Sequence, residues 1–195
     1  MKNRVITISR EFGSGGRTIG KKVAEKLEIP CYDAKIIQEM VKETGFAPDY
    51  VKEAGEYAPG GFLSNAFSNR MFGPTNEDIL WEYQYKIIKQ LAEKEPCVIV
   101  GRCADYILRN RPHCMRIFLH APAEYRVKRI MRTENLSHDA ALTKAIQMNR
   151  KRSDNYHYYT HQPWGLSRNY HLTLDTSLGD DFVLDSICEG LKHIQ

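Results

Sequence analysis

A glycine-rich stretch near the start of the chain has the residue types that bind phosphate groups. It reads Ser-Arg-Glu-Phe-Gly-Ser-Gly-Gly-Arg-Thr over residues 9–18 and follows an alternating apolar run over residues 5–8. A helical pattern comes next. In that order the N–H groups of the turn and of the helix N-terminus converge on one anion. We therefore expect four turn residues to bind the phosphates of a nucleotide: Gly13, Ser14, Gly15 and Gly16.

The same stretch partly matches the P-loop pattern G-x-x-x-x-G-K-[ST]. With the last three positions on Gly16, Arg17 and Thr18, Arg17 replaces the lysine and Glu11 replaces the first glycine. A guanidinium binds phosphate oxygens as a two-pronged donor, whereas lysine acts as a point charge. We expect Arg17 to hold phosphate oxygens of the nucleotide, and Thr18 to lie beside them and offer its hydroxyl to Mg²⁺. The alternative is an ordinary strand-to-helix turn with a surface arginine.

Three further polar residues follow predicted strands, so they share one edge of a sheet. Asp33 ends a short strand over 29–33, and Arg102 follows a buried strand over 97–100, with Asp105 close behind it. We expect Arg102 to clamp a phosphate of the nucleotide ligand and Asp105 to hydrogen-bond its sugar or base. The alternatives are a strand-end salt bridge for Arg102 and a helix N-cap or first-turn position for the two carboxylates.

Composition narrows the class of protein. A chain of 195 residues is long enough for one domain with a sizeable core. The net charge of +4 suits anionic small molecules, but no Lys/Arg block indicates a nucleic-acid tail. The five cysteines form no C-x-x-C pair, so we expect no zinc site and a reduced, cytoplasmic location. No apolar run approaches the length needed to span a membrane.

Strands alternating with helices must position these residues. The pattern predicts an α/β fold, with a parallel central sheet flanked by helices on both faces. Ligands of such sheets bind beyond the carboxyl ends of the strands, where the candidate residues lie. The expected strands span about 4–9, 29–33, 97–100, 115–119 and 170–175, and the expected helices about 19–27, 34–44, 76–94, 122 onward, 137–154 and the C-terminal stretch.

Residues 45–76 differ in character from the rest of the chain. Gly, Pro, Asn, Ser and Phe dominate there. A long loop inside a compact domain is usually functional or disordered. We expect a mobile insert beside the site.

Three segments together resemble the cytidylate-kinase-like family, a branch of the P-loop nucleoside monophosphate kinases. They are the loop over 9–17, the block Cys-Val-Ile-Val-Gly-Arg-Cys-Ala-Asp-Tyr-Ile-Leu over 97–108, and Trp164-Gly165 with 170–177. The resemblance covers nearly the whole chain. It implies a three-layer P-loop kinase fold in a single domain over 1–195, with a helical lid. It also implies phosphoryl transfer from ATP, with Mg²⁺, to a nucleoside monophosphate or a similar small acceptor, and CMP or dCMP is the default acceptor.

The resemblance also implies roles for individual residues. Phosphoryl transfer needs cations that converge on the transferred group. In the lid, over about 126–165, Arg129 and Arg150 are then expected to close over the phosphates as catalytic residues. In the loop, Arg17 and Thr18 are expected to bind ATP, and Arg17 to act in catalysis in place of the lysine. Asp175 and Thr176 lie where such kinases hold ATP. Asp33 lies where acceptor-site residues cluster, so that Asp33, Arg102 and Asp105 would bind the acceptor. The insert over 45–76 would lie on the acceptor side. A solvated helix face is the alternative for the arginines, and a structural turn for residues 175–176.

The sequence departs from the cytidylate kinase pattern at two places. The loop lysine is absent, and Cys103 replaces the acid of the Gly-Arg-Asp motif, with Asp105 as its nearest substitute. These departures keep open a nucleotide-binding regulator without turnover. A nucleic-acid binder has only the modest positive charge in its favour. We expect nucleotide and small-molecule partners, no nucleic acid or membrane partner, and a monomer or homodimer.

Overall fold

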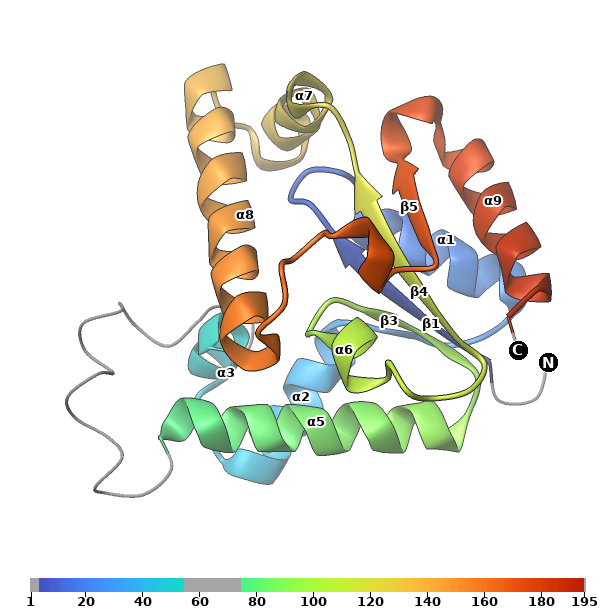
Figure 1. Cartoon of the computed structure of the whole chain (residues 1–195). Coiled ribbons are helices and arrows are strands. Elements are labelled where there is room, and N and C mark those ends of the chain that lie inside the picture. The colour runs from blue at the N-terminus through green and yellow to red at the C-terminus, as the bar shows by residue number, and fades with distance from the viewer. Residues whose placement is uncertain (1–3, 55–74, 195) are drawn as a thin grey trace.

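The computed structural model describes residues 4–54 and 75–194 (Figure 1). Its centre is a parallel sheet with the order β2-β3-β1-β4-β5. The central strand pairs with a neighbour on each side, in registers that place Val5 opposite both Cys97 and Cys114. The strands are β1 Val5–Arg10, β2 Cys31–Tyr32, β3 Cys97–Val100, β4 Cys114–His120 and β5 Leu172–Asp175.

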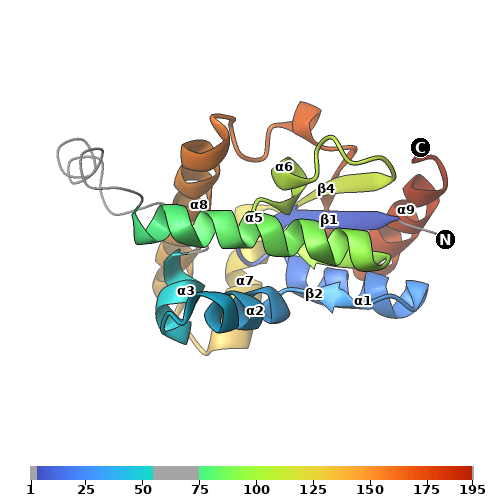
Figure 2. The ribbon, with the colours of Figure 1, turned by 90° about the horizontal axis from the view of Figure 1, so that it is seen from below.

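Helices cover both faces of the sheet, which confirms the predicted three-layer α/β fold. Along β1 the side chains alternate, so that Ile6 and Ile8 pack with α1 and α9, whereas Val5 packs with α2 and α5. Figure 2 shows α2 and α5 side by side on their face. The helices of these two layers are α1 Gly16–Leu27, α2 Ala34–Thr44, α3 Pro48–Ala54, α5 Asn76–Lys94, α6 Ala104–Ile107 and α9 Asp180–Lys192.

Two helices lie at the carboxyl ends of the strands, outside the two layers. They are α7 Ala123–Glu134 and α8 His138–Thr160. In Figure 1 the arrowheads of β1 and β4 point toward this pair. The two helices share a small apolar core of their own, made by Val127, Ile130, Ala141 and Ala145. The chain then returns through two short 3₁₀ turns, η1 Ser167–Asn169 and η2 Thr176–Leu178.

Helix α8 is longer than the sequence pattern suggested. It continues past residue 154 to Thr160, because the aromatic residues of its last turns pack on the body of the protein. The ring of Tyr159 stacks on Trp81 of α5, with centroids 4.2 Å apart. Tyr156 is buried and donates a hydrogen bond to Asp105. These contacts anchor the C-terminal end of α8 against α5 and α6.

The expected insert over 45–76 is wrong for its first part. Residues 48–54 form helix α3, with Pro48 at the first position and Asp49 in the first turn, both of which favour helix initiation. Val51 is fully buried in the core beneath α2 and α5. The rest of that expectation falls on residues 55–74, which lie outside the described residues.

Candidate active site

The glycine turn between β1 and α1 forms the floor of the site. Gly13 and Gly15 adopt φ angles of +84° and +83°, which only glycine tolerates easily. A Cβ atom built on Gly13 would lie 2.9 Å from the carbonyl oxygen of Arg126. Gly15 is the N-cap of α1, so the N–H groups of the first turn of that helix have no helical acceptor. These groups face the space where an anion can bind.

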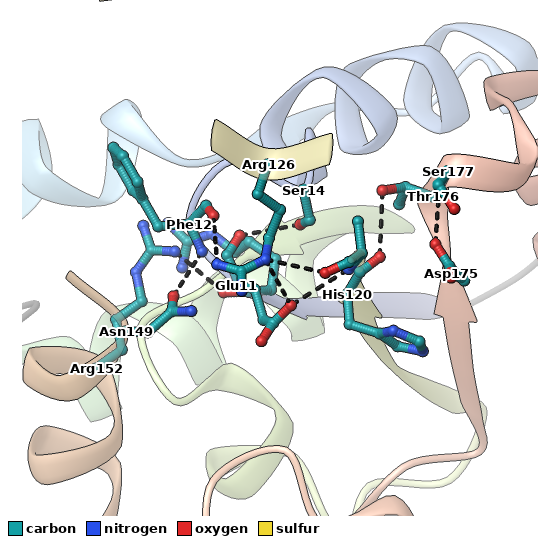
Figure 3. Close-up of polar contacts among 12 residues, drawn as sticks. Glu11, Phe12, Ser14, His120, Arg126, Asn149, Arg152, Asp175, Thr176 and Ser177 are labelled. Atoms are coloured by element: carbon teal, nitrogen blue, oxygen red, sulfur yellow. Dashed lines mark hydrogen bonds and ion pairs between the residues drawn. The ribbon is translucent and has the colours of Figure 1, made fainter. Parts of the chain in front are cut away.

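Glu11 fastens the turn to the start of α7 (Figure 3). Its carboxylate lies 3.1 Å from Nε of Arg126 and accepts a hydrogen bond of 3.2 Å from the N–H of Ala121. Arg126 also donates to the carbonyl of Ala121, at 3.0 Å. The carboxylate at the position expected for a glycine therefore holds two chain segments together.

Helix α8 also contacts the turn. The side chain of Asn149 accepts a hydrogen bond of 2.7 Å from the N–H of Phe12, and Arg152 donates one of 3.0 Å to the carbonyl of Arg10. The guanidinium of Arg152 lies over the ring of Phe12 (Figure 3). The backbone of the turn is thus held from α7 on one side and from α8 on the other.

Of the two predicted catalytic arginines outside the turn, the structure brings one to it. Nη2 of Arg129 donates a hydrogen bond of 2.9 Å to the hydroxyl of Thr18. A Cβ atom built on Gly15 would lie 3.1 Å from the guanidinium carbon of Arg129. Arg150 instead lies on the solvent side of α8, with its side chain 83% exposed and 3.8 Å from Asp154. Arg129 therefore joins Arg126 as a cation of α7 near the turn: Arg126 pairs with Glu11, whereas Arg129 reaches Thr18.

Arg17 and Asp33 lie together, although the sequence suggested different ligands for them. The guanidinium of Arg17 forms an ion pair with the carboxylate of Asp33, at the end of β2. The arginine side chain is 63% exposed and the aspartate side chain 13% exposed. Asp33 precedes α2 without capping it by its side chain. The pair joins the start of α1 to the acceptor side of the sheet.

A strained turn after β3 presents Arg102. Three consecutive residues, Gly101, Arg102 and Cys103, have φ angles of +75°, +59° and +52°. Two of them carry side chains, and such backbone strain clusters at functional sites. The carbonyl of Arg102 accepts a hydrogen bond of 3.1 Å from the buried amide of Gln84 on α5. Arg102 itself is 4% exposed.

Asp105 is buried where β1, α6 and α8 meet. One carboxylate oxygen accepts a hydrogen bond of 3.0 Å from Ser9, and the other accepts one of 2.8 Å from Tyr156. Burial raises the pKa of this carboxyl, while the bonds from Tyr156 and Ser9 act in the opposite direction. In this structure both oxygens bind protein hydroxyls, so the carboxylate fixes the geometry of the site.

The raised pKa of Asp105 predicts a pH dependence of stability. In the unfolded chain this carboxyl loses its proton at lower pH than in the folded chain, so its contribution to the free energy of unfolding falls as pH rises above 3.8. Asp105→Asn has no such titration. We expect the stability of the native protein relative to this variant, measured by urea unfolding, to decrease between pH 4 and pH 7. An increase over that range would contradict the assignment.

Comparison with known proteins identifies the family. The model of the cytidylate kinase-like family matches residues 5–178. The chain belongs to the cytidylate kinase-like family. A cytidylate kinase of Methanocaldococcus jannaschii is 29% identical over 196 residues, which cover 98% of this chain and 99% of that protein.

Solved structures agree with the observed fold. An uncharacterized protein from Eubacterium ventriosum superposes with a TM-score of 0.77 at 30% identity, covering 98% of this chain and 99% of the other. A gluconokinase from Sinorhizobium meliloti has a TM-score of 0.56 at 17% identity, covering 98% and 93%, and it shows the fold alone. Together the comparisons confirm the P-loop kinase fold of this family member and support a nucleotide kinase.

Two predicted ATP-binding residues of this cytidylate kinase-like chain hold the turn after β5 (Figure 3). The carboxylate of Asp175 accepts a hydrogen bond of 2.8 Å from the N–H of Ser177, and this bond lowers the pKa of Asp175. Thr176 is buried, and its hydroxyl donates to the carbonyl of His120 at 3.2 Å. The two side chains therefore fix a turn at the carboxyl edge of the sheet.

The sequence pattern missed the roles of several residues at this site. Arg10 and Asn149 received no assignment, although each contacts another part of the site. The described residues also contain no helix long and apolar enough to cross a membrane. Among residues 4–54 and 75–194, no three His, Cys, Asp or Glu side chains gather where a metal ion could bind.

Proposed function

We propose that this protein transfers a phosphoryl group from ATP to a nucleoside monophosphate, with CMP or dCMP the first candidates. The contact between Arg129 and Thr18 carries this proposal, because it places a guanidinium over the open N–H groups of α1. Membership of the cytidylate kinase-like family and a relative named as a cytidylate kinase support the acceptor class.

The proposed mechanism depends on position and charge. The N–H groups of the turn bind the polyphosphate of ATP, assisted by the turn that Asp175 and Thr176 hold. Arg129 neutralises charge on the transferred group, and Arg150 and Arg17 join it when substrates bind. The acceptor lies between Asp33, Arg102 and Asp105. No general base is needed, since an acceptor phosphate is already a nucleophile at neutral pH.

Magnesium suits the donors of this site. Mg²⁺ keeps several waters and binds through few protein groups together with substrate phosphates. The hydroxyl of Thr18, in the first turn of α1, is the protein group that would hold it. When bound, the ion neutralises charge on the phosphates. The hydroxyl already accepts from Arg129, so the ion and this arginine would act on the same phosphates.

We place this reaction in one domain over residues 1–195, with about 126–165 as its lid. The small core shared by α7 and α8 supports a lid that packs as a unit. All five cysteines are free thiols, which supports a cytoplasmic enzyme. The oligomeric state that we propose is a monomer or homodimer.

A coupled ADP-release assay tests the proposal. With Mg·ATP present, we expect CMP or dCMP to give the highest kcat/KM among the common nucleoside monophosphates. Faster turnover of gluconate or shikimate would keep a kinase but contradict the acceptor class. The second candidate, a nucleotide-binding regulator, is favoured by the engagement of Arg17 with Asp33. Binding of ATP with no turnover of any acceptor would support that candidate instead.

A further inference from the structure

We propose that Arg10 takes the place of the P-loop lysine and, with Arg102 and Arg152, binds the phosphoryl group in transit. This inference rests on the proposed function and assigns the loop cation within it. The argument begins with the register of the loop. In the P-loop pattern the lysine directly follows the last glycine of the turn. Here that glycine is Gly15, because it caps α1 with a positive φ angle, whereas Gly16 is already helical.

The lysine position therefore falls on Gly16 and not on Arg17, and the Ser/Thr position falls on Arg17 and not on Thr18. The magnesium role proposed for Thr18 then rests on its place in the first turn of α1 and not on the pattern. Counting back along the same pattern, its first glycine falls on Arg10. The chain thus has a cation where the pattern has a glycine, and a glycine where the pattern has the cation. This exchange keeps one positive charge at the loop. The residue that carries it is then the last of β1 and not the first of α1.

Packing explains why the two changes occur together. A Cβ atom built on Gly16 would lie 2.6 Å from both Cβ and Cγ of Arg10. Real Cβ atoms do not approach other atoms so closely, so the side chain of Arg10 occupies the space that a lysine at 16 would need. A side chain at one of the two positions excludes a side chain at the other.

The guanidinium of Arg10 then crosses the turn after β3. A Cβ atom built on Gly101 would lie 2.1 Å from Nη1 of Arg10 and 2.9 Å from its Cζ. Gly101 is therefore needed for the path of this side chain as well as for its own φ angle of +75°. Arg10 is only 7% exposed, and its guanidinium lies beside the carboxyl ends of β1 and β3, where the acceptor is expected.

Arg10, Arg102 and Arg152 line the same small pocket. Its cavity of about 30 Å³ has room for about two water-sized groups, the size of phosphoryl oxygens, and not for a nucleoside. Asp105 lies behind the pocket with both oxygens engaged by Ser9 and Tyr156. Guanidinium groups bind phosphoryl oxygens through charge-assisted hydrogen bonds, so a pocket lined by three arginines suits a phosphoryl group. The pocket is lined by Ser9, Arg10, Gly101, Arg102, Cys103, Arg152, Asn155, Tyr156 and Trp164.

The step itself needs no proton from Arg10. An oxygen of the acceptor phosphate forms a bond to the γ-phosphorus of ATP, while the bond from that phosphorus to the β–γ bridging oxygen breaks. ADP leaves with the electron pair of the broken bond. The guanidinium of Arg10 stays protonated and binds the oxygens of the group as its charge spreads in the transition state.

An exchange experiment tests the assignment. Arg10→Gly is expected to lower turnover by about a hundredfold, the scale of removing one preorganised donor to a transition state. Adding Gly16→Lys to that variant restores the usual order of glycine and lysine, and we expect it to regain at least tenfold. Gly16→Lys alone collides with Arg10 and is expected to be impaired. Arg109→Gln, an exposed arginine away from the pocket, serves as the matched control. Urea unfolding midpoints report whether each variant folds.

Binding of inorganic tripolyphosphate gives a second readout that does not depend on turnover. Calorimetry is expected to show weaker binding for Arg10→Gly than for the native protein, and recovery for the Arg10→Gly, Gly16→Lys double variant. Unchanged binding and turnover for folded Arg10→Gly would overturn the assignment, as would a double variant no better than the single one. If the native protein binds tripolyphosphate but phosphorylates no monophosphate, the proposed function fails while the binding comparison still decides the role of Arg10.

Discussion

Replacing Arg129 with glutamine is expected to lower turnover on the order of a thousandfold, the lower part of the range for an arginine that stabilises a phosphoryl-transfer transition state. Arg129 on α7 donates to Thr18 and lies against Gly15, whereas Arg126 on the same helix pairs with Glu11. Glutamine retains a hydrogen-bond donor but removes the positive charge. Steady-state kinetics and calorimetric binding of Mg·ATP measure the two effects separately.

The affinity for ATP is expected to change much less than turnover. The open N–H groups of α1 remain in the variant and bind the polyphosphate in the ground state. Lys128→Gln is the matched control, since Lys128 is on the same helix but mostly exposed, with its Nζ 3.8 Å from Glu124. Equal turnover in Arg129→Gln and Lys128→Gln would remove Arg129 from the mechanism.

Replacing Gly101 with alanine is expected to abolish most activity as well as destabilise the fold. The left-handed φ angle at this position costs an L-residue about 1–2 kcal/mol. The new methyl group would also lie 2.1 Å from Nη1 of Arg10, so the guanidinium must leave its place. We expect turnover to fall by at least about a hundredfold, the loss typical of one misplaced charge-stabilising donor. Coupled kinetics and urea unfolding measure the two changes.

Gly45→Ala separates these two effects. Gly45 also has a positive φ angle, +69°, but a Cβ atom built on it meets nothing within 4 Å. Its substitution therefore carries the backbone strain without the collision. We expect Gly45→Ala to lose stability and keep turnover within about twofold, since the strain lies at the C-cap of α2, away from the pocket. Loss of stability alone in Gly101→Ala, with native turnover, would contradict the path assigned to Arg10.

The regular elements could be predicted from sequence because burial of one face spaces the apolar residues at regular intervals along the chain. The helix over 76–94 and the strand over 97–100 have the predicted bounds. Each is marked by an apolar stripe or an apolar run, and the helix begins at a capping box made by Thr75 and Asp78. Helix α3 was missed because its seven residues are too few for a period to stand out from the Gly- and Pro-rich text around them.

The loop register could not be predicted in the same way. The P-loop pattern can be aligned to this loop in two registers that differ by one residue, with its last glycine on Gly16 or on Gly15. Both positions are glycines, so the sequence does not distinguish the two registers. Only the backbone shows that Gly15 takes the left-handed conformation and that Gly16 enters the helix. The choice then moves the cation from Arg17, which pairs with Asp33, to Arg10, which crosses Gly101.

Long-range contacts were also invisible in the sequence. Asp105 was predicted to bind the sugar or base of an acceptor, and that role stays a prediction. Its hydrogen-bond partners Ser9 and Tyr156 are 96 and 51 residues away along the chain, so no local pattern announces them. The same is true of Arg129 and Thr18, which are 111 residues apart. The sequence indicated which residue types take part, whereas the sheet order determined which of them meet.

Calorimetric titration of the native protein with Mg·ATP tests the central claim most directly, namely that the glycine turn and the arginines around it bind a polyphosphate. We predict saturable binding at one site per chain, weakened when Arg10 is replaced by glycine and restored when Gly16 is also replaced by lysine. No heat of binding, together with a crystal soaked in Mg·ATP in which the turn holds no nucleotide, would contradict the claim.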